Sequence, residues 1–241
     1  MAESEDHKLL TIDQWNEWWK KDYERSKSKG SKGGDICEHG DEDNPFDQAS
    51  PMLRKHIKSL LPNAIRKRIF LPLCGKSPDI KWLIDEGYEV VGLECSEHAI
   101  LEFFEENSVE FEKSVSTKDH SFRVYTGKTA NVVIYEGDYF KFNSDIAGGL
   151  FDAVWDSASL NTIELASRKP YVEIMRSVLD KQAKYMLSAM YFGEKRTWIN
   201  NPFDITDADM TELFGEYFTW DKVDEDDSEW GLERIFLITF K

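Results

Sequence analysis

From residue 68 onward the chain alternates short apolar strands with amphipathic helices, and this alternation restricts the possible folds more than any other feature of the sequence. Such alternation is typical of a largely parallel sheet with helices on both faces. Strands are expected at 68–73, 89–95, 121–125, 131–135, 151–155, 184–191, 217–223 and 234–240. Helices are expected at 79–86, 97–107, 170–179 and 206–214. The pattern predicts an α/β fold with a mostly parallel, six- or seven-stranded sheet that ends in an antiparallel hairpin, with 121–125 as an inserted antiparallel strand.

The residues before this core carry a different pattern. A helix is expected at 11–23, with Thr11 as its N-cap and three tryptophans at helical spacing. The segment 26–45 is rich in Gly, Ser and charge, and it is either a surface insertion or a lid over the site. We therefore expect a single domain over 1–241, with a leading helix in 1–25, an insertion at 26–45 and a core at 46–241.

Charge and composition exclude several classes of protein. With 41% hydrophobic and 13% aromatic residues, the chain has enough apolar surface to fold. The formal net charge of −16 disfavours binding to phosphate backbones and to anionic membrane surfaces. Neither a nucleic acid nor a membrane is therefore expected as a partner.

Cysteine content and the first residues indicate the compartment. The chain has only three cysteines, without the spacing of a disulfide framework or a zinc site. The sequence begins MAESEDHK, which lacks the basic and then apolar pattern of a secretory signal, and no apolar run approaches the roughly 20 residues that span a bilayer. We expect a cytoplasmic protein, a monomer, without a bound metal.

The turn after the first strand contains the first candidate site residue. In sheets of this kind the ligand lies beyond the carboxyl ends of the strands. The motif LPLCGK at 71–76 follows the first strand, and Gly75 permits close approach of the backbone to a ligand. A dinucleotide site would show G-x-G-x-x-G, so the single glycine argues against a nicotinamide cofactor. An ordinary turn glycine is the alternative.

Acidic residues follow the next two parallel strands. Glu94 ends the strand VVGLE about 20 residues beyond Gly75, where a carboxylate could accept hydrogen bonds from both hydroxyls of a ribose. A solvated carboxylate is the alternative interpretation. In YEGDYF at 135–140, Asp138 could accept from an adenine amine while the ring of Tyr139 covers the base.

The motif FDAVWDSASL at 151–160 would bring Asp156 and Ser157 to the same edge. A direct role and a structural role, with Trp155 in the core and Asp156 as a helix cap, remain equally open here. The order of glycine turn, ribose acid, GD turn and WD strand is more specific than any of its parts. Together these motifs indicate an adenosine-containing ligand.

These residues resemble the thiopurine S-methyltransferases and their thiol methyltransferase relatives. The shared motifs are LTIDQWNEWW at 10–19, PFDQ at 45–48, FLPLCGKSPDIKWL at 70–83, VVGLECSE at 90–97, YEGDYF, FDAVWD and WGL at 230–232. The resemblance implies a Rossmann-like class I methyltransferase fold with a seven-stranded sheet, and S-adenosylmethionine as the cofactor.

The resemblance also assigns site residues. The family's cofactor residues fall on Trp15, Trp19, Leu73, Glu94, Asp138 and Tyr139, and Gly75 and Ser157 lie beside them at the same strand ends. Phe46 matches an aromatic residue that contacts the acceptor and the sulfonium side. The leading helix would then cover the cofactor, whereas without the resemblance its tryptophans would be interpreted as packing residues.

Two positions depart from the family. Mammalian members have an arginine where this chain has Ser157, and a second arginine where the alignment gives Asp226. Both changes remove positive charge from the acceptor side, so we expect weak activity on anionic thiopurines and better activity on neutral thiols.

The expected reaction needs little beyond positioning, because a thiolate is already nucleophilic near neutral pH. No catalytic base is assigned, although Asp156 and Tyr191 are minor candidates. The expected function is S-methylation of a small thiol or thiopurine-like acceptor. The alternatives are a halide or thiocyanate methyltransferase of the same fold, a noncatalytic adenosine-binding protein and, third, a dinucleotide oxidoreductase.

Overall fold

The structure is a computed structural model that describes residues 17, 21, 48–62, 68–198, 201–229 and 231–241. Trp15, Trp19, Phe46 and the insertion 26–45 therefore lie outside the described residues. Within 11–23, Glu17 and Lys21 are helical, which agrees with the helix expected there.

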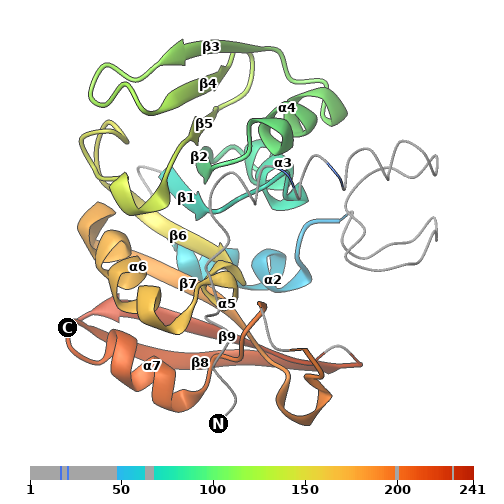
Figure 1. Cartoon of the computed structure of the whole chain (residues 1–241), viewed down its shortest axis with the longest axis vertical. Coiled ribbons are helices and arrows are strands. Elements are labelled where there is room, and N and C mark those ends of the chain that lie inside the picture. Colours follow the sequence, from blue (N-terminus) through green and yellow to red (C-terminus); the bar gives the residue numbers. More distant parts are fainter. Residues whose placement is uncertain (1–16, 18–20, 22–47, 63–67, 199–200, 230) are drawn as a thin grey trace, which may run out of the picture.

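One sheet of nine strands runs through the molecule, in the order β3-β4-β5-β2-β1-β6-β7-β9-β8 (Figure 1). The strands are β1 (Arg68–Pro72), β2 (Glu89–Glu94), β3 (Phe111–Val115), β4 (Arg123–Gly127), β5 (Val132–Glu136), β6 (Phe151–Ser157), β7 (Leu179–Tyr191), β8 (Phe218–Ser228) and β9 (Gly231–Phe240). Strands β5, β2, β1, β6 and β7 are mutually parallel. The hairpin β8–β9 closes the sheet on the side of β7, as the sequence predicted.

The sheet contains more antiparallel pairing than expected. Strand β4 is antiparallel to β5, as predicted for the inserted segment, and β3 adds a second antiparallel strand outside it. The sequence pattern missed β3 because four of its five residues are exposed, so that no apolar alternation marks it. Nine strands in a mixed sheet thus replace the seven mostly parallel strands of the expectation.

Helices cover both faces of the sheet, as predicted. On one face lie α2 (Pro51–Leu60), α3 (Pro78–Asp85) and α4 (Glu97–Glu106), and on the other α6 (Leu165–Val178) and α7 (Asp207–Phe214) (Figure 1). The short helix α5 (Ser159–Thr162) and the 3-10 turns η2 (Tyr139–Lys141) and η3 (Gly193–Lys195) follow β6, β5 and β7. Each of these three short elements follows the carboxyl end of a parallel strand.

The helix ends show which sequence signals were reliable. The capping box of α7 is present, because Thr206 accepts from the backbone N–H of Asp209 while Asp209 accepts from the backbone N–H of Thr206. The expected start of α6 at residue 170 was wrong, since α6 begins at Leu165 and contains Pro170. Pro170 lies inside the helix, where it has no backbone N–H to donate to the preceding turn. Buried side chains on both sides of it, Arg168 and Tyr171, keep this helix packed on the sheet.

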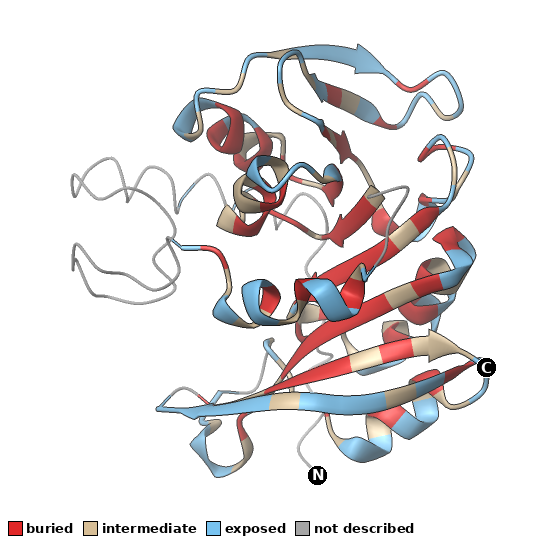
Figure 2. Ribbon diagram, turned by 180° about the vertical axis from the view of Figure 1, so that it is seen from behind, coloured by how far each residue is buried: buried red, intermediate tan, exposed pale blue. Residues whose placement is uncertain are grey.

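The core lies on both faces of the central strands. Figure 2 shows nearly continuous burial along β1, β2 and β6, whereas β8 at the edge is mostly exposed. One apolar cluster packs under α6 and α7, and the other under α2, α3 and α4. This packing fixes the positions of the strand ends, at which the candidate site residues lie.

Candidate functional site

Four parallel strands end at the same edge of the sheet, and each end contributes a candidate residue. Strand β1 pairs with β2 on one side and with β6 on the other, and β2 pairs with β5. The chain therefore leaves β1 toward β2 and later returns to the opposite side of β1 with β6. A ligand in such a sheet binds where the winding direction changes, at the carboxyl ends of β1 and β6.

The turn after β1 has an unusual backbone. Leu73 has φ 44°, and Gly75 has φ 51°. A left-handed conformation is ordinary for glycine, but for a leucine it costs about 1–2 kcal/mol, and residues of this kind gather at functional sites. The backbone N–H of Cys74 donates to the carbonyl oxygen of Leu93 over 3.0 Å, which attaches the turn to β2.

Glu94 at the end of β2 is buried, with 5% of its surface exposed. Its Oε2 accepts from the backbone N–H of Gly75 over 2.9 Å, and its Oε1 accepts from the backbone N–H groups of Cys95 and Ser96 over 2.8 and 2.9 Å. The alternative of a solvated carboxylate is therefore wrong. A carboxylate has about four acceptor positions, and three are used, so Oε2 retains room for one further donor.

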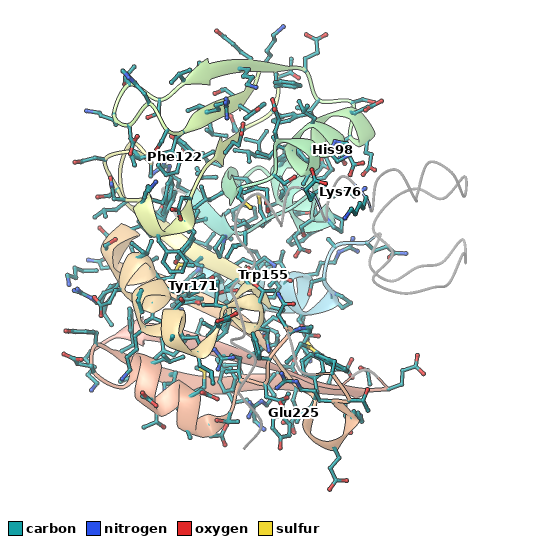
Figure 3. The ribbon with its side chains drawn as sticks, viewed as in Figure 1. Lys76, His98, Phe122, Trp155, Tyr171 and Glu225 are labelled. Carbon is teal, nitrogen blue, oxygen red and sulfur yellow. The ribbon has the colours of Figure 1, made fainter. Side chains whose placement is uncertain are left out.

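Two thiols and a lysine near this turn are held by neighbouring groups of the protein. Burial, and next the charge of Glu94, raise the pKa of the Cys74 thiol well above its ordinary value, and the same two causes raise that of Cys95. Lys76 forms ion pairs with Glu106 at 2.8 Å and Glu102 at 3.2 Å, and so lies beside α4 (Figure 3). Both thiols are thus neutral, and the lysine ammonium is already paired.

The end of β5 differs in part from the expectation. Asp138 remains partly exposed and caps η2, since its Oδ1 accepts from the backbone N–H of Phe140 over 2.9 Å. The expectation that the ring of Tyr139 covers a base is wrong, because the residue is buried, with 5% of its surface exposed, and its ring stacks on Tyr171 with 4.5 Å between the centroids. Its hydroxyl donates to the carbonyl oxygen of Tyr171 over 2.8 Å. The 3-10 turn directs Tyr139 toward α6 and leaves Phe140 exposed at 43%.

Asp156 in β6 is fully buried and accepts several hydrogen bonds. Its Oδ2 accepts from the hydroxyls of Tyr171 and Tyr185 over 2.7 and 2.6 Å, and its Oδ1 accepts from the backbone N–H groups of Ser159 and Leu160 over 2.8 and 3.4 Å. The structural interpretation of Asp156 is thus the correct one, with two tyrosines in addition to the cap. No sequence signal indicated these tyrosines, because they come from distant elements of the chain.

The neighbours of Asp156 along β6 point to the opposite face. The indole Nε1 of Trp155 donates to Oδ2 of Asp79 over 2.7 Å, and Trp155 lies in the centre of the molecule (Figure 3). Ser157 is exposed at the end of the strand. A pocket of about 80 Å³ at this point is lined by Leu71, Pro72, Leu73, Cys74, Ser77, Trp155, Ser157 and Ser159. The predicted residues Leu73 and Ser157 therefore meet in one pocket between β1 and β6.

A larger hollow of about 470 Å³ lies between α4 and β3, lined by Leu101, Phe104, Glu105, Val109, Glu110, Phe111 and Lys128. This hollow is remote from the carboxyl ends of β1 and β6, where a sheet of this kind binds its ligand, so the smaller pocket is the candidate site. Within the described ranges, no group of three or more His, Cys, Asp or Glu side chains is arranged to bind a metal. No helix among these residues is long and apolar enough to cross a membrane.

Sequence comparison gives a consistent result. A family model described as thiopurine S-methyltransferase matches residues 38–234. Thiopurine S-methyltransferase of Panthera leo is 29% identical over 100% of this chain and 94% of its own length. That of Rattus norvegicus is 29% identical over 100% of this chain and 96% of its own length.

Solved structures resemble the fold at lower sequence identity. The magnesium protoporphyrin IX methyltransferase of Synechocystis, solved with bound SAH, has a TM-score of 0.66 at 14% identity and covers 95% of this chain and 98% of its own. An S-adenosylmethionine-dependent methyltransferase of Anabaena variabilis has a TM-score of 0.64 at 14% identity, over 97% of this chain and 96% of its own. These likenesses support the class I methyltransferase fold.

Proposed function

Because the chain belongs to the thiopurine S-methyltransferase family, we propose that it transfers the methyl group of S-adenosylmethionine to the sulfur atom of a small, uncharged thiol. The family makes the chain an S-adenosylmethionine-dependent methyltransferase. The identity of the acceptor and the roles of the individual residues are the proposal.

The observation that supports cofactor binding most directly is the remaining acceptor position on Glu94. We propose that Oε2 accepts from one ribose hydroxyl, and that the second hydroxyl binds only if it displaces a backbone donor. Leu73 and Gly75 would hold the amino-acid portion of the cofactor through the turn that they shape. The residues at this edge therefore fit the cofactor.

At the end of β5 we propose a hydrogen-bonding role in place of ring stacking. The partly exposed carboxylate of Asp138 would accept from the adenine amine, while the backbone N–H of Tyr139 would donate to a ring nitrogen. The exposed ring of Phe140 in the same turn offers the apolar surface that the buried ring of Tyr139 does not. Trp15, Trp19 and Phe46 are proposed to cover the cofactor and the acceptor, as the family resemblance implies.

The acceptor class follows from the charges at the acceptor side. Ser157 carries no charge and lines the pocket between β1 and β6, and Asp226 is exposed on β8. Neither can form the paired, charge-assisted hydrogen bonds with which an arginine holds a carboxylate. A neutral, compact thiol is therefore favoured over an anionic thiopurine.

When bound, the cofactor supplies a methyl group on a positively charged sulfur, ready for in-line displacement. The protein's own contribution is to orient the two sulfur atoms and to exclude water. The walls of the pocket are suited to this, because Leu71, Pro72, Leu73 and Trp155 surround it with apolar surface.

The test compares acceptors and cofactors in the purified chain. We expect S-adenosylhomocysteine to bind in calorimetry and a nicotinamide dinucleotide not to bind. Specificity constants for a thiopurine, a mercaptobenzoate and a thiophenol without a carboxylate should then favour the thiophenol. Ser157→Arg should move the preference toward the mercaptobenzoate, whereas the matched control Ser157→Ala should not. A native preference for the carboxylated thiol would contradict the proposal.

Two alternatives remain open to the same assays. Turnover of iodide or thiocyanate in preference to every thiol would indicate a halide or thiocyanate methyltransferase. Binding of S-adenosylhomocysteine without turnover of any acceptor would indicate a noncatalytic adenosine-binding protein. We also propose that the enzyme is cytoplasmic, which the free thiols of Cys74 and Cys95 support, and that it acts as a monomer, which light scattering tests.

A further inference from the structure

Glu233 on β9 is a partly buried carboxylate at the acceptor side that the proposed function does not yet use. It pairs with Met190, one residue before β7 ends at Tyr191, and therefore lies close to the sheet edge that carries the pocket. Its Oε1 accepts from the hydroxyl of Ser188 over 2.6 Å. No other hydrogen bond to this carboxylate is formed by the residues that the structure describes.

The sheet register places Glu233 on the same face as the pocket residue Ser157. Ser157 pairs with Ser188 across β6 and β7, and Ser188 pairs with Ile235 across β7 and β9. Paired residues share a face, and so do residues two apart on one strand. Ser157, Ser188 and Glu233 therefore form a polar row across three neighbouring strands, on the face that α2 and α3 cover.

The charged groups that face Glu233 are predominantly acidic. They are Asp79 of α3, and Asp224 and Asp226 of β8. From α2, Lys55 and His56 contact Asp224, each at 2.5 Å, and the guanidinium of Arg54 lies over the ring of Trp82 at 5.8 Å. Burial raises the pKa of Glu233, the hydrogen bond from Ser188 opposes the rise, and the three aspartates add to it. This carboxylate consequently binds a proton more readily than an ordinary glutamate.

We propose that Glu233 is the proton acceptor for thiols that arrive protonated at this site. The proposal rests on the proposed function and extends it. The S–H bond breaks, its electron pair stays on sulfur, and the proton forms an O–H bond on Glu233. The resulting thiolate attacks the methyl group as the bond between that group and the sulfonium breaks, and Glu233 then releases its proton to solvent.

Three other candidate groups at the carboxyl ends of the strands are less suited to this role. Both oxygens of Asp156 accept hydrogen bonds in a fully buried position. Glu94 has three backbone donors on its carboxylate. Tyr191, the second candidate from the sequence, is a phenol, and its ring lies under the guanidinium of Arg234 at 5.5 Å. Glu233 alone among these four combines partial exposure with a carboxylate held by a single hydrogen bond.

The experiment compares two thiols of similar size with the full chain at saturating S-adenosylmethionine. One is an aryl thiol that is ionised at the assay pH, and the other is an alkyl thiol that remains protonated. Glu233→Gln should lower kcat/KM for the protonated thiol by about 100-fold or more, and should change that for the ionised thiol by less than about threefold. The matched control Asp221→Asn removes an exposed charge from β8 and should alter neither value.

A pH profile separates proton transfer from a structural role. The native enzyme should lose activity on the protonated thiol as Glu233 becomes protonated at low pH, and Glu233→Gln should lack this acid limb. Ser188→Ala removes the hydrogen bond to Glu233 but leaves its carboxylate in place, so kcat/KM should fall less than in Glu233→Gln, and only for the protonated thiol. This variant provides the test if Glu233→Gln does not fold. Equal losses on both thiols, or no loss on either, would overturn the role of Glu233. Failure of the native chain to methylate any thiol would instead refute the proposed function.

Discussion

The backbone N–H of Gly75 donates to Oε2 of Glu94 over 2.9 Å and so joins the turn after β1 to the end of β2. This bond couples the two positions that the sequence had marked independently as ligand-binding. The carboxylate therefore shapes the turn and also faces the proposed ribose position.

The first prediction concerns Glu94→Ala. Removing the carboxylate should weaken binding of S-adenosylhomocysteine by about 1–3 kcal/mol, because a ribose hydroxyl loses its acceptor and the Gly75 turn loses its anchor. Glu94→Gln retains one acceptor oxygen and should lose less affinity. Isothermal titration calorimetry measures both, with the exposed Glu86→Ala as control. An unchanged dissociation constant in Glu94→Ala would remove Glu94 from the site.

The second prediction tests why β2 carries a glycine in VVGLE. A Cβ atom on Gly92 would lie 2.7 Å from Sγ of Cys74 and 3.4 Å from Cγ1 of Ile134. Gly92→Ala should therefore lower the free energy of unfolding by about 1–3 kcal/mol, through overpacking under the Leu73–Gly75 turn. Adding Cys74→Ala removes the clashing sulfur and should recover most of the loss. Urea denaturation of the two single variants and the double variant measures this coupling, and purely additive effects would contradict it.

The third prediction concerns the buried carboxylate of Asp156. Asp156→Ala leaves the hydroxyls of Tyr171 and Tyr185 without their acceptor, and it should lower the free energy of unfolding by about 2–4 kcal/mol. Tyr171→Phe removes a single donor and keeps the ring, so it should be milder. If Asp156→Ala kept the native free energy of unfolding, these hydrogen bonds would make no net contribution to stability.

The effect of Asp156→Ala should also depend on pH. Burial raises the pKa of Asp156 above its ordinary value of 3.8, and the hydrogen bonds from Tyr185 and Tyr171 oppose this shift. The folded chain then holds the proton more tightly than the unfolded chain does, so the native protein loses stability as the pH rises from about 4 through the raised pKa. The stability difference between native protein and variant should shrink over that rise. A difference that grows with pH would show that the sign is wrong.

The fourth prediction falls on the leading helix, most of which lies outside the described residues. If Trp15 and Trp19 cover the cofactor, amide hydrogen exchange within 11–23 should slow when S-adenosylhomocysteine is added. Peptides from the exposed edge strand β8 provide an internal reference that should not respond. Protection confined to the ends of β1 and β2 would leave this helix a packing element.

Local patterns in the sequence were sufficient to determine most of the fold. The alternation of apolar strands and amphipathic helices gave the parallel centre, the helices on both faces and the final hairpin, because periodicity reports directly which side of an element is buried. It did not reveal β3, whose exposed residues do not alternate, or the true start of α6 before Pro170. In both segments the local sequence disfavours the observed structure, and tertiary contacts stabilise it: strand pairing in β3, and packing on the sheet in α6.

The candidate site, like the fold, was determined partly by sequence motifs and partly by tertiary structure. Motif order indicated Gly75, Glu94 and Ser157 at strand ends, and the family resemblance added Leu73, because parallel strands bring their carboxyl ends to one edge whatever the side chains between them. Tertiary structure decided which side chains face the ligand. It turned the ring of Tyr139 into the core, surrounded Asp156 with hydroxyls from α6 and β7, and brought Glu233 into one row with Ser157. Such contacts join residues far apart in the chain, so no local pattern can encode them, and only packing of the finished sheet brings them together.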